Sequence, residues 1–304
     1  MGFGASRPGA AAATGVQIDV IPAERVACPW LVPVLEPRRR SVIPPLPARG
    51  ALEVKTLGVC IRALPLALLA LLTQSSWSQE ALPPGFVRLH DVAPSIRQDI
   101  RYAGPLNFTG HVVPGYERAQ CITREHTAQA LARAQARLST EGFALKVYDC
   151  YRPARAVRAF AAWSRSPGGD AMRPVFYPAL DKSSLFALGY IAPHSRHSLG
   201  IAVDVGLVRA DESDGSAAAT GGRCDGPFEQ RAGESSLDFG TAYDCFSERS
   251  ATASPKISAN ARANRDRLRR ALAAEGFHNY WREWWHYELG DPSAPIKAHD
   301  FAVR

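Results

Sequence analysis

Residues 201–205 read IAVDV and place a single carboxylate inside an otherwise apolar segment. The alternation predicts a β-strand with Ile201, Val203 and Val205 on one face and Asp204 on the other. Burying an ionised carboxylate among Ile, Val and Ala is costly unless the group is paired or binds a cation. This strand therefore requires that the fold bring a compensating group to Asp204.

Two further segments carry candidates for that group. His197 lies in a turn seven residues before Asp204, and residues 283–286 read EWWH. Two histidines and one aspartate form a three-ligand set that leaves a fourth position open for water, as in catalytic zinc sites. A nearby carboxylate outside the ligand set, here Glu283, can act as base on that water. Because residues three apart in a strand point to opposite faces, Glu283 must lie at a bend before the strand if His286 is a ligand.

Each of these elements also has a simpler interpretation. A histidine in a turn can be a solvated or capping residue, and a Trp-Trp pair can belong to the core. His194 is a rival ligand, although Pro193 argues against a regular helix that would align it with His197. We interpret the other histidines of the chain as structural, namely His90, His111, His126, His278 and His299.

The region after residue 78 is expected to form one domain of mixed α and β structure without internal repeats. Apolar periodicity, together with glycine and proline positions, predicts its elements. In chain order these are a helix from Thr123 that Gly142 ends, a strand over 143–148, a helix with Pro153 in its first turn, a polar surface excursion over 209–236, a basic amphipathic helix over 260–275 and a last strand within the aromatic run 280–287.

The first 78 residues differ from the rest in pattern. Residues 63–72 form an uninterrupted apolar run after Lys55 and Arg62, which is the layout of a secretory signal peptide cleaved after Ser78. Such a run is too short to span a bilayer, so no stable membrane span is expected; a buried helix or a retained anchor is the alternative. We therefore divide the chain into an over-extended or disordered N-terminus (1–53), a signal peptide (54–78) and a domain (79–304), and expect export to the periplasm.

The balance of charged residues argues against a nucleic-acid partner. The formal net charge is +7, but the first 78 residues hold 8 Lys and Arg against 4 Asp and Glu. The remaining residues hold 28 against 25, without a long basic run. This balance gives no electrostatic footprint for a polyanion, so a nucleic-acid partner is not expected.

Four cysteines lie in the expected domain, Cys121, Cys150, Cys224 and Cys245. An exported protein meets an oxidising compartment, so two disulfides are expected, and four cysteines allow three connectivities. No CxxC spacing occurs, which argues against a zinc site built from all four cysteines. Free buried thiols are the alternative.

The pattern SxHxxGxAxD at 195–204, followed by ExxH at 283–286, resembles the zinc D-alanyl-D-alanine dipeptidases related to the vancomycin-resistance enzymes. Other segments fit the family pattern in the same order, including DCYRP at 149–153 and GTAYD at 240–244. The similarity covers roughly residues 85–304. It implies an α+β fold, with a small antiparallel sheet, flanking helices and a zinc D,D-peptidase-like site.

The resemblance also implies roles for the matching positions. His197, Asp204 and His286 would bind one zinc ion per chain, and Glu283 would take a proton from the water at the metal. Arg152 would stabilise the oxyanion, because a fixed guanidinium suits developing negative charge. A salt bridge to Asp149 is the simpler interpretation of Arg152.

Four more positions would contact the substrate in this resemblance. Ser195 and Tyr116 would line the pocket, while Tyr102 and Asp244 would meet the free ammonium of a dipeptide. Ordinary packing is the alternative for Tyr102 and Asp244.

The chain departs from the family pattern between Asp204 and Gly240, where it is longer and carries Cys224. Cys245 directly follows Asp244, so a bridge between Cys224 and Cys245 would tie the longer segment beside the pocket. Held beside the pocket, the longer segment could narrow or widen the pocket entrance and so change the substrate range. A bridge between Cys121 and Cys150 would be the other disulfide.

These expectations describe an exported zinc enzyme that hydrolyses the small dipeptide D-alanyl-D-alanine, in cell-wall turnover or D-alanine catabolism. A cytoplasmic enzyme of this kind could instead deplete the dipeptide and confer glycopeptide resistance. Two other functions stay open, a zinc D,D-carboxypeptidase acting on longer wall peptides and a metal-free wall-binding module. The presence of all three ligands and the base counts against the module.

Overall fold

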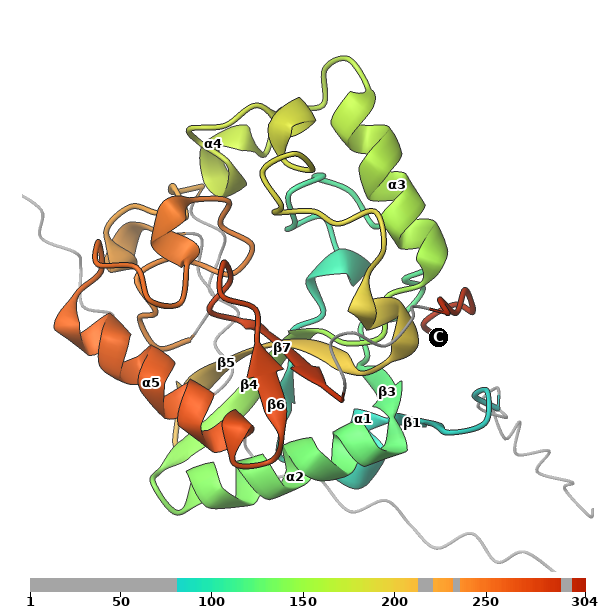
Figure 1. Cartoon of the computed structure of the whole chain (residues 1–304), viewed down its shortest axis with the longest axis vertical. Coiled ribbons are helices and arrows are strands. Elements are labelled where there is room, and N and C mark those ends of the chain that lie inside the picture. The colour runs from blue at the N-terminus through green and yellow to red at the C-terminus, as the bar shows by residue number, and fades with distance from the viewer. Residues whose placement is uncertain (1–80, 213–220, 232–235, 291–296) are drawn as a thin grey trace, which may run out of the picture. The chain divides into compact units, whose positions relative to one another are not determined.

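The computed structural model describes residues 81–212, 221–231, 236–290 and 297–304, and a five-stranded sheet lies at its centre (Figure 1). The strands are ordered β2 (Arg97–Gln98), β4 (Phe143–Asp149), β5 (Ala202–Arg209), β7 (His286–Leu289) and β6 (Phe277–Asn279). A second, two-stranded sheet pairs β1 (Phe86–Arg88) with β3 (Ile122–Arg124) antiparallel. The fold is therefore mixed α and β.

Helices α2 (Glu125–Ser139) and α5 (Ala259–Ala273) pack against each other, α2 covering β4 and α5 covering β6 (Figure 1). Helix α3 (Ala154–Arg165) lies apart from this pair, on the other side of the molecule in the same view. The remaining helical segments are short: α1 (Leu89–Val92), α4 (Arg173–Phe176) and the 3₁₀ turns η1 (Arg101–Ala103), η2 (Lys182–Ser184), η3 (Arg196–Leu199), η4 (Phe228–Gln230) and η5 (Glu248–Ser250).

The two central strands are buried along nearly their whole length. Every residue of β4 after Phe143 is buried, and so is every residue of β5 before Arg209. Leu145 and Val147 of β4 belong to the same core as Leu131 of α2. The predicted strand over 143–148 is thus confirmed and extends by one residue to Asp149.

The sheet differs from the antiparallel one that the resemblance implied. All neighbouring strands are antiparallel except β2 and β4, which run parallel. Helix α2 lies between these two strands in the chain, and parallel neighbours need a crossover connection of this kind.

Helix boundaries are shifted slightly from those predicted. The apolar face of α2 is buried as expected, but the helix begins at Glu125 because Thr123 is paired in β3 and donates a hydrogen bond from Oγ1 to the carbonyl of Gly200 at 2.7 Å. Pro153 directly precedes α3 instead of lying in its first turn. The helix expected over 260–275 is confirmed as α5, in which Ser258 accepts a capping hydrogen bond from the amide of Ala261.

Two other expectations were partly wrong. The aromatic run 280–287 is mostly a turn, and only its last two residues, His286 and Tyr287, enter β7. The excursion over 209–236 is not wholly at the surface, because Cys224 is fully buried and its amide donates to the carbonyl of Val175 at 2.8 Å. The polar composition of this segment gives no indication of the buried contact, which a single cysteine makes.

The structure contains both disulfides in the expected pairing, Cys121 with Cys150 and Cys224 with Cys245. The first joins the residue before β3 to the residue after β4, and the second joins the excursion to the residue after Asp244. Both therefore lie next to segments that carry expected site residues.

The N-terminal segment and the signal peptide (1–53 and 54–78) lie outside the described residues, so both stay predictions. Within the described part of the chain, no helix is both long enough and apolar enough to cross a bilayer.

Gly200 ends η3, and we predict that a side chain at this position destabilises the fold. Its φ is +75°, and a Cβ there would lie 2.4 Å from Cε1 of the buried Phe86. Gly142 is a matched control, because its φ is +78° but a Cβ would meet no atom within 4 Å.

We expect Gly142→Ala to lower the free energy of unfolding by about 1–2 kcal/mol, the cost of left-handed backbone. Gly200→Ala should lower it by about 2–5 kcal/mol, because overpacking against Phe86 is added. Urea unfolding of the two variants measures the difference. Equal losses would show that the contact with Phe86 does not constrain this turn.

Candidate functional site

Strand register brings Asp204 and His286 together. The two residues are directly opposite in the antiparallel pair of β5 and β7, and Nδ1 of His286 lies 3.1 Å from Oδ1 of Asp204. Asp204 is 2% exposed, so its carboxylate is buried as the apolar strand predicted. The phenol of Tyr243 donates a hydrogen bond to Oδ2 of Asp204 at 3.0 Å.

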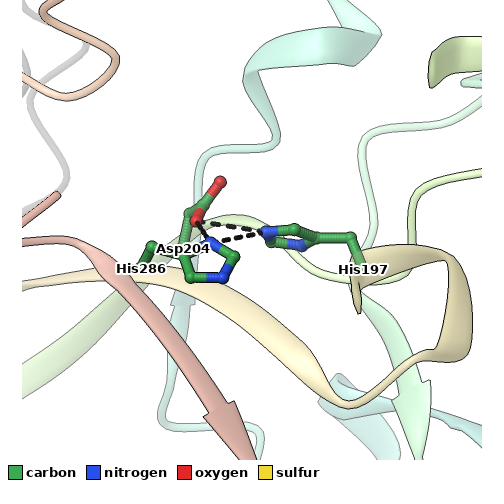
Figure 2. Close-up of side chains that lie close together, drawn as sticks. All are labelled: His197, Asp204 and His286. Atoms are coloured by element: carbon green, nitrogen blue, oxygen red, sulfur yellow. Dashed lines mark hydrogen bonds and ion pairs between the residues drawn. The ribbon is translucent and has the colours of Figure 1, made fainter. Parts of the chain in front are cut away.

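His197 reaches the same point from the turn η3. Ser195 precedes this turn with an extended backbone, and Gly200 ends it. Nε2 of His197 lies 3.3 Å from Oδ1 of Asp204 and 3.1 Å from Nδ1 of His286 (Figure 2). Side chains from a turn and two strands therefore converge in one cluster.

Each imidazole of the cluster has its outer nitrogen engaged by an acceptor. Nδ1 of His197 donates to the carbonyl of Cys150 at 2.7 Å, and Nε2 of His286 donates to Oε1 of Glu288 at 3.0 Å. In the neutral form that binds a metal, an imidazole has only one N–H, and the hydrogens of both rings then point away from Asp204. Both inner nitrogens then present lone pairs to each other and to the carboxylate.

Three electron-pair donors at one point fit a metal ion. The inner atoms are 3.1–3.3 Å apart, which matches the edge of about 3.3 Å expected for a tetrahedron with ligand distances of about 2.0–2.1 Å. Within the described ranges, His197, Asp204 and His286 are the group of His, Cys, Asp or Glu side chains that could hold a metal. Two imidazoles with a carboxylate suit a transition metal such as zinc.

The charges of the cluster agree with this interpretation. Burial raises the pKa of Asp204, but His197 and His286 outweigh burial and hold it well below its usual range. Burial lowers the pKa of His286, yet hydrogen bonds to Asp204 and Glu288 raise it to about 10. The cluster therefore attracts positive charge, which a proton supplies when no metal is bound.

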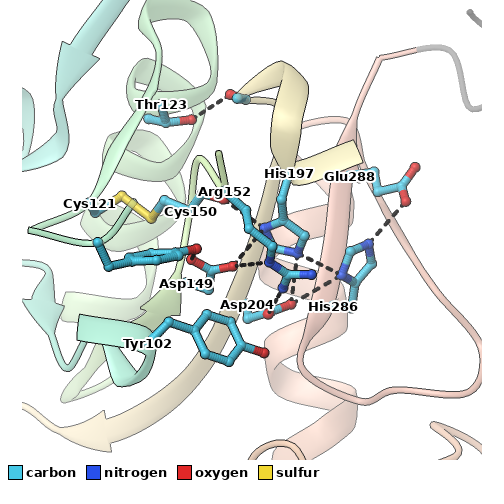
Figure 3. A network of polar contacts seen from close by, with 12 residues as sticks. Tyr102, Cys121, Thr123, Asp149, Cys150, Arg152, His197, Asp204, His286 and Glu288 are labelled. Atoms are coloured by element: carbon cyan, nitrogen blue, oxygen red, sulfur yellow. Dashed lines mark hydrogen bonds and ion pairs between the residues drawn. A yellow bond between two sulfur atoms is a disulfide. The ribbon is translucent and has the colours of Figure 1, made fainter. Parts of the chain in front are cut away.

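Arg152 lies beside the cluster and is held by two carboxylates. Its Nε lies 2.9 Å from Oδ2 of Asp149, and its Nη2 lies 3.5 Å from Oδ2 of Asp204 (Figure 3). The guanidinium carbon is also 5.1 Å from the centroid of the Tyr102 ring. The salt bridge to Asp149 is thus present, and it holds the guanidinium at the cluster.

Asp149 connects several groups behind the cluster. A bulge after Val147 places this last residue of β4 opposite Asp204. Its Oδ1 accepts a hydrogen bond from the phenol of Tyr116 at 2.6 Å, and its Oδ2 lies 3.5 Å from Nδ1 of His197. Tyr116 therefore contacts Asp149, and it is not among the residues that line the cavity described below.

Asp244 is the one described residue other than glycine with a positive φ, +56°. Its carboxyl group is buried and accepts a hydrogen bond from the phenol of Tyr102 at 2.8 Å. Burial, followed by the charge of Asp204, raises the pKa of Asp244 well above its usual range. A strained backbone that holds a buried carboxyl group is typical of a functional site.

A cavity of about 220 Å³ opens onto these groups. Glu283 lines it from the turn before β7, the bend that its spacing from His286 requires, and burial raises the pKa of Glu283 to about 8. His194 also lines the cavity but is exposed and lies outside the cluster. The expected site residues in the wall are Tyr102, Arg152, Ser195, His197, Asp204, Asp244, Glu283 and His286, which leaves out only Tyr116.

Three residues in contact with the cluster were missed as site residues by sequence reasoning: Asp149, Tyr243 and Glu288. Asp149 and Tyr243 lie in the segments DCYRP and GTAYD, and both segments fit the family pattern, so they could have been found from the resemblance. Glu288 could have been found from strand periodicity, because it follows His286 by two residues and so lies on the same face of β7.

Comparison with known proteins identifies the family of this chain. The chain matches peptidase family M15, described as D-Ala-D-Ala dipeptidase, over residues 83–304. It is 34% identical over 220 residues to a D-alanyl-D-alanine dipeptidase of Enterococcus faecium, covering 72% of this chain and 98% of that protein. A D-alanyl-D-alanine dipeptidase of Streptomyces coelicolor is 35% identical over 218 residues, covering 72% and 98%.

A D-alanyl-D-alanine dipeptidase of Escherichia coli is 27% identical over 217 residues, which cover 71% of this chain and 91% of that protein. The matched region begins just before β1 and includes every residue of the cluster and its cavity. The protein is thus a dipeptidase that belongs to the D-Ala-D-Ala dipeptidase family of metallopeptidases, peptidase family M15.

Proposed function

We propose that the protein is a zinc-dependent enzyme that hydrolyses D-alanyl-D-alanine to two molecules of D-alanine. The observation that carries the proposal is the convergence of two imidazole nitrogens and one carboxylate oxygen within 3.1–3.3 Å of one another. The substrate is inferred from the relatives that bear this name, together with the buried carboxyl group of Asp244 in the cavity wall.

Nε2 of His197, Oδ1 of Asp204 and Nδ1 of His286 would hold one zinc ion. Nitrogen and oxygen donors with a position left open suit zinc better than calcium or magnesium, which prefer oxygen ligands. Zinc bound there would supply Lewis-acid chemistry for the attack of water on a peptide carbonyl.

Glu283 would accept the proton of the attacking water. Burial raises the pKa of its carboxyl group to about 8 without a metal. A neighbouring cation would lower it towards the range in which proton transfer is efficient at neutral pH. Arg152 would face the negative charge that develops on the carbonyl oxygen, and its ion pair with Asp149 keeps the guanidinium in place for that task.

Asp244 and Tyr102 would favour a substrate with a free amino end. The Asp244 carboxyl group is buried and accepts a hydrogen bond from Tyr102, so an ammonium group would supply the opposite charge. The cavity of about 220 Å³ also fits a small molecule, because sites for drug-sized ligands begin at about 300 Å³. Both features favour a dipeptidase over a D,D-carboxypeptidase that acts on longer wall peptides.

We also propose that the enzyme is exported, on the basis of the signal-peptide layout of residues 54–78. Outside the membrane it would meet dipeptide released from the wall. This location favours a role in wall turnover or D-alanine catabolism over glycopeptide resistance.

Replacing Glu283 should separate the base from the ligands. Glu283→Gln is expected to retain zinc but to lose at least about 10²-fold in kcat on D-alanyl-D-alanine, because an amide cannot accept the proton. His197→Ala should lose both zinc and activity. Elemental analysis and steady-state kinetics measure both effects, and loss of zinc from the Glu283 variant would make Glu283 a ligand.

Acetylating the amino end of the substrate should nearly abolish cleavage. N-acetyl-D-alanyl-D-alanine has no ammonium group and cannot form the buried ion pair with Asp244, and the loss of one partner of such a pair costs about 3–5 kcal/mol. We expect kcat/KM to fall by at least about 10²-fold relative to the free dipeptide.

Asp244→Asn should narrow that difference, because the amide carries no charge. Assays of L-alanyl-L-alanine and of chelator-treated enzyme are the controls for stereochemistry and metal dependence. Equal cleavage of free and acetylated dipeptides by the unmodified enzyme would favour the carboxypeptidase assignment.

A further inference from the structure

We propose that Glu288 is a positioning residue that orients the ligand His286 directly and the ligand His197 through its neighbour Arg196, with one hydrogen bond to each oxygen of its carboxylate. The inference rests on the proposed metal site and goes beyond it. None of the proposed catalytic steps uses Glu288.

The first contact of Glu288 is with His286. The two residues are two apart in β7, so their side chains leave the strand on the same face. Oε1 of Glu288 accepts the hydrogen of Nε2 of His286 at 3.0 Å (Figure 3). Because an ionised carboxylate only accepts hydrogen bonds, this contact fixes the tautomer and leaves Nδ1 of His286 free to bind metal.

The second contact connects Glu288 to the element that carries His197. Oε2 of Glu288 lies 3.2 Å from Nε of Arg196, which begins η3 directly before His197. The two side chains are only 19% and 9% exposed, so water screens this pair less than a surface ion pair. One carboxylate therefore connects β7 to η3.

The two ligands differ in what supports their outer nitrogens. His197 donates to a neutral backbone carbonyl, that of Cys150, whereas His286 donates to the charged group of Glu288. A carboxylate partner raises the basicity of an imidazole ligand and orients its ring. Loss of Glu288 should therefore weaken metal binding mainly through His286.

Glu288 and Arg196 also line the cavity, so direct contact with the substrate is the competing explanation. A residue that only contacts substrate would change KM and leave the affinity for zinc unchanged. The two explanations are therefore separated by measuring zinc affinity in the absence of substrate.

The test compares Glu288→Ala and Glu288→Gln with the control Glu141→Ala. Glu141 precedes β4 at the end opposite Asp149 and pairs with Arg267 at the same Nε to Oε2 distance, 3.2 Å. Competition with a chromophoric chelator gives the zinc dissociation constant of the purified protein. Thermal unfolding of the metal-free variants reports folding.

We expect Glu288→Ala to weaken zinc binding by about 10–100-fold and Glu288→Gln by a smaller factor of at least about threefold, since the amide oxygen can still accept from His286. Glu141→Ala should bind zinc like the unmodified protein. If Glu288→Ala does not fold, the comparison of Glu288→Gln with the control decides.

Arg196→Met should weaken zinc binding by a smaller factor beside Glu288→Ala than in the unmodified background, because the contact that the two side chains share is already lost there. Unchanged zinc affinity in both Glu288 variants would overturn the inference, and a raised KM would then assign Glu288 to the substrate. Failure of the unmodified protein to bind zinc would instead overturn the proposed metal site.

Discussion

The structure depends on how the carboxylate of Asp204 is compensated within a central strand. This group is 2% exposed, and its neighbours are His197 from η3, His286 from β7, the phenol of Tyr243 and the guanidinium of Arg152. Burial of an ionised carboxylate without such partners would cost several kcal/mol. The groups that compensate the charge of Asp204 allow β5 to be buried. The same groups form the site.

Several parts of the fold and of the site could be predicted because the sequence pattern that indicates each of them lies within one short segment. The alternation around Asp204 indicated a strand with a carboxylate on its own face, and the bend before His286 followed from the spacing of Glu283. The buried face of α2 was visible in its helical periodicity. In each case the residues within one element determined the expectation.

The rest depended on contacts between distant segments. Strand β2 is only two residues long, and its parallel pairing with β4 depends on the crossover connection through α2 that lies between the two strands in the chain. The start of α2 was displaced because Thr123 pairs in a second sheet. Tyr116 matched a family position, yet the structure turns its phenol to Asp149, a contact that depends on a bulge in β4. Register and bulges of this kind leave no periodic trace in a sequence.

His197, Asp204 and His286 are proposed to bind one divalent metal ion together. X-ray absorption at the zinc edge of the purified, zinc-loaded protein reports the atoms that surround the metal. The expected spectrum shows nitrogen and oxygen neighbours at about 2.0–2.1 Å, with outer scattering from two imidazoles and without sulfur. A shell that contains sulfur, or one with fewer than two imidazoles, would show that these three side chains do not form the metal site.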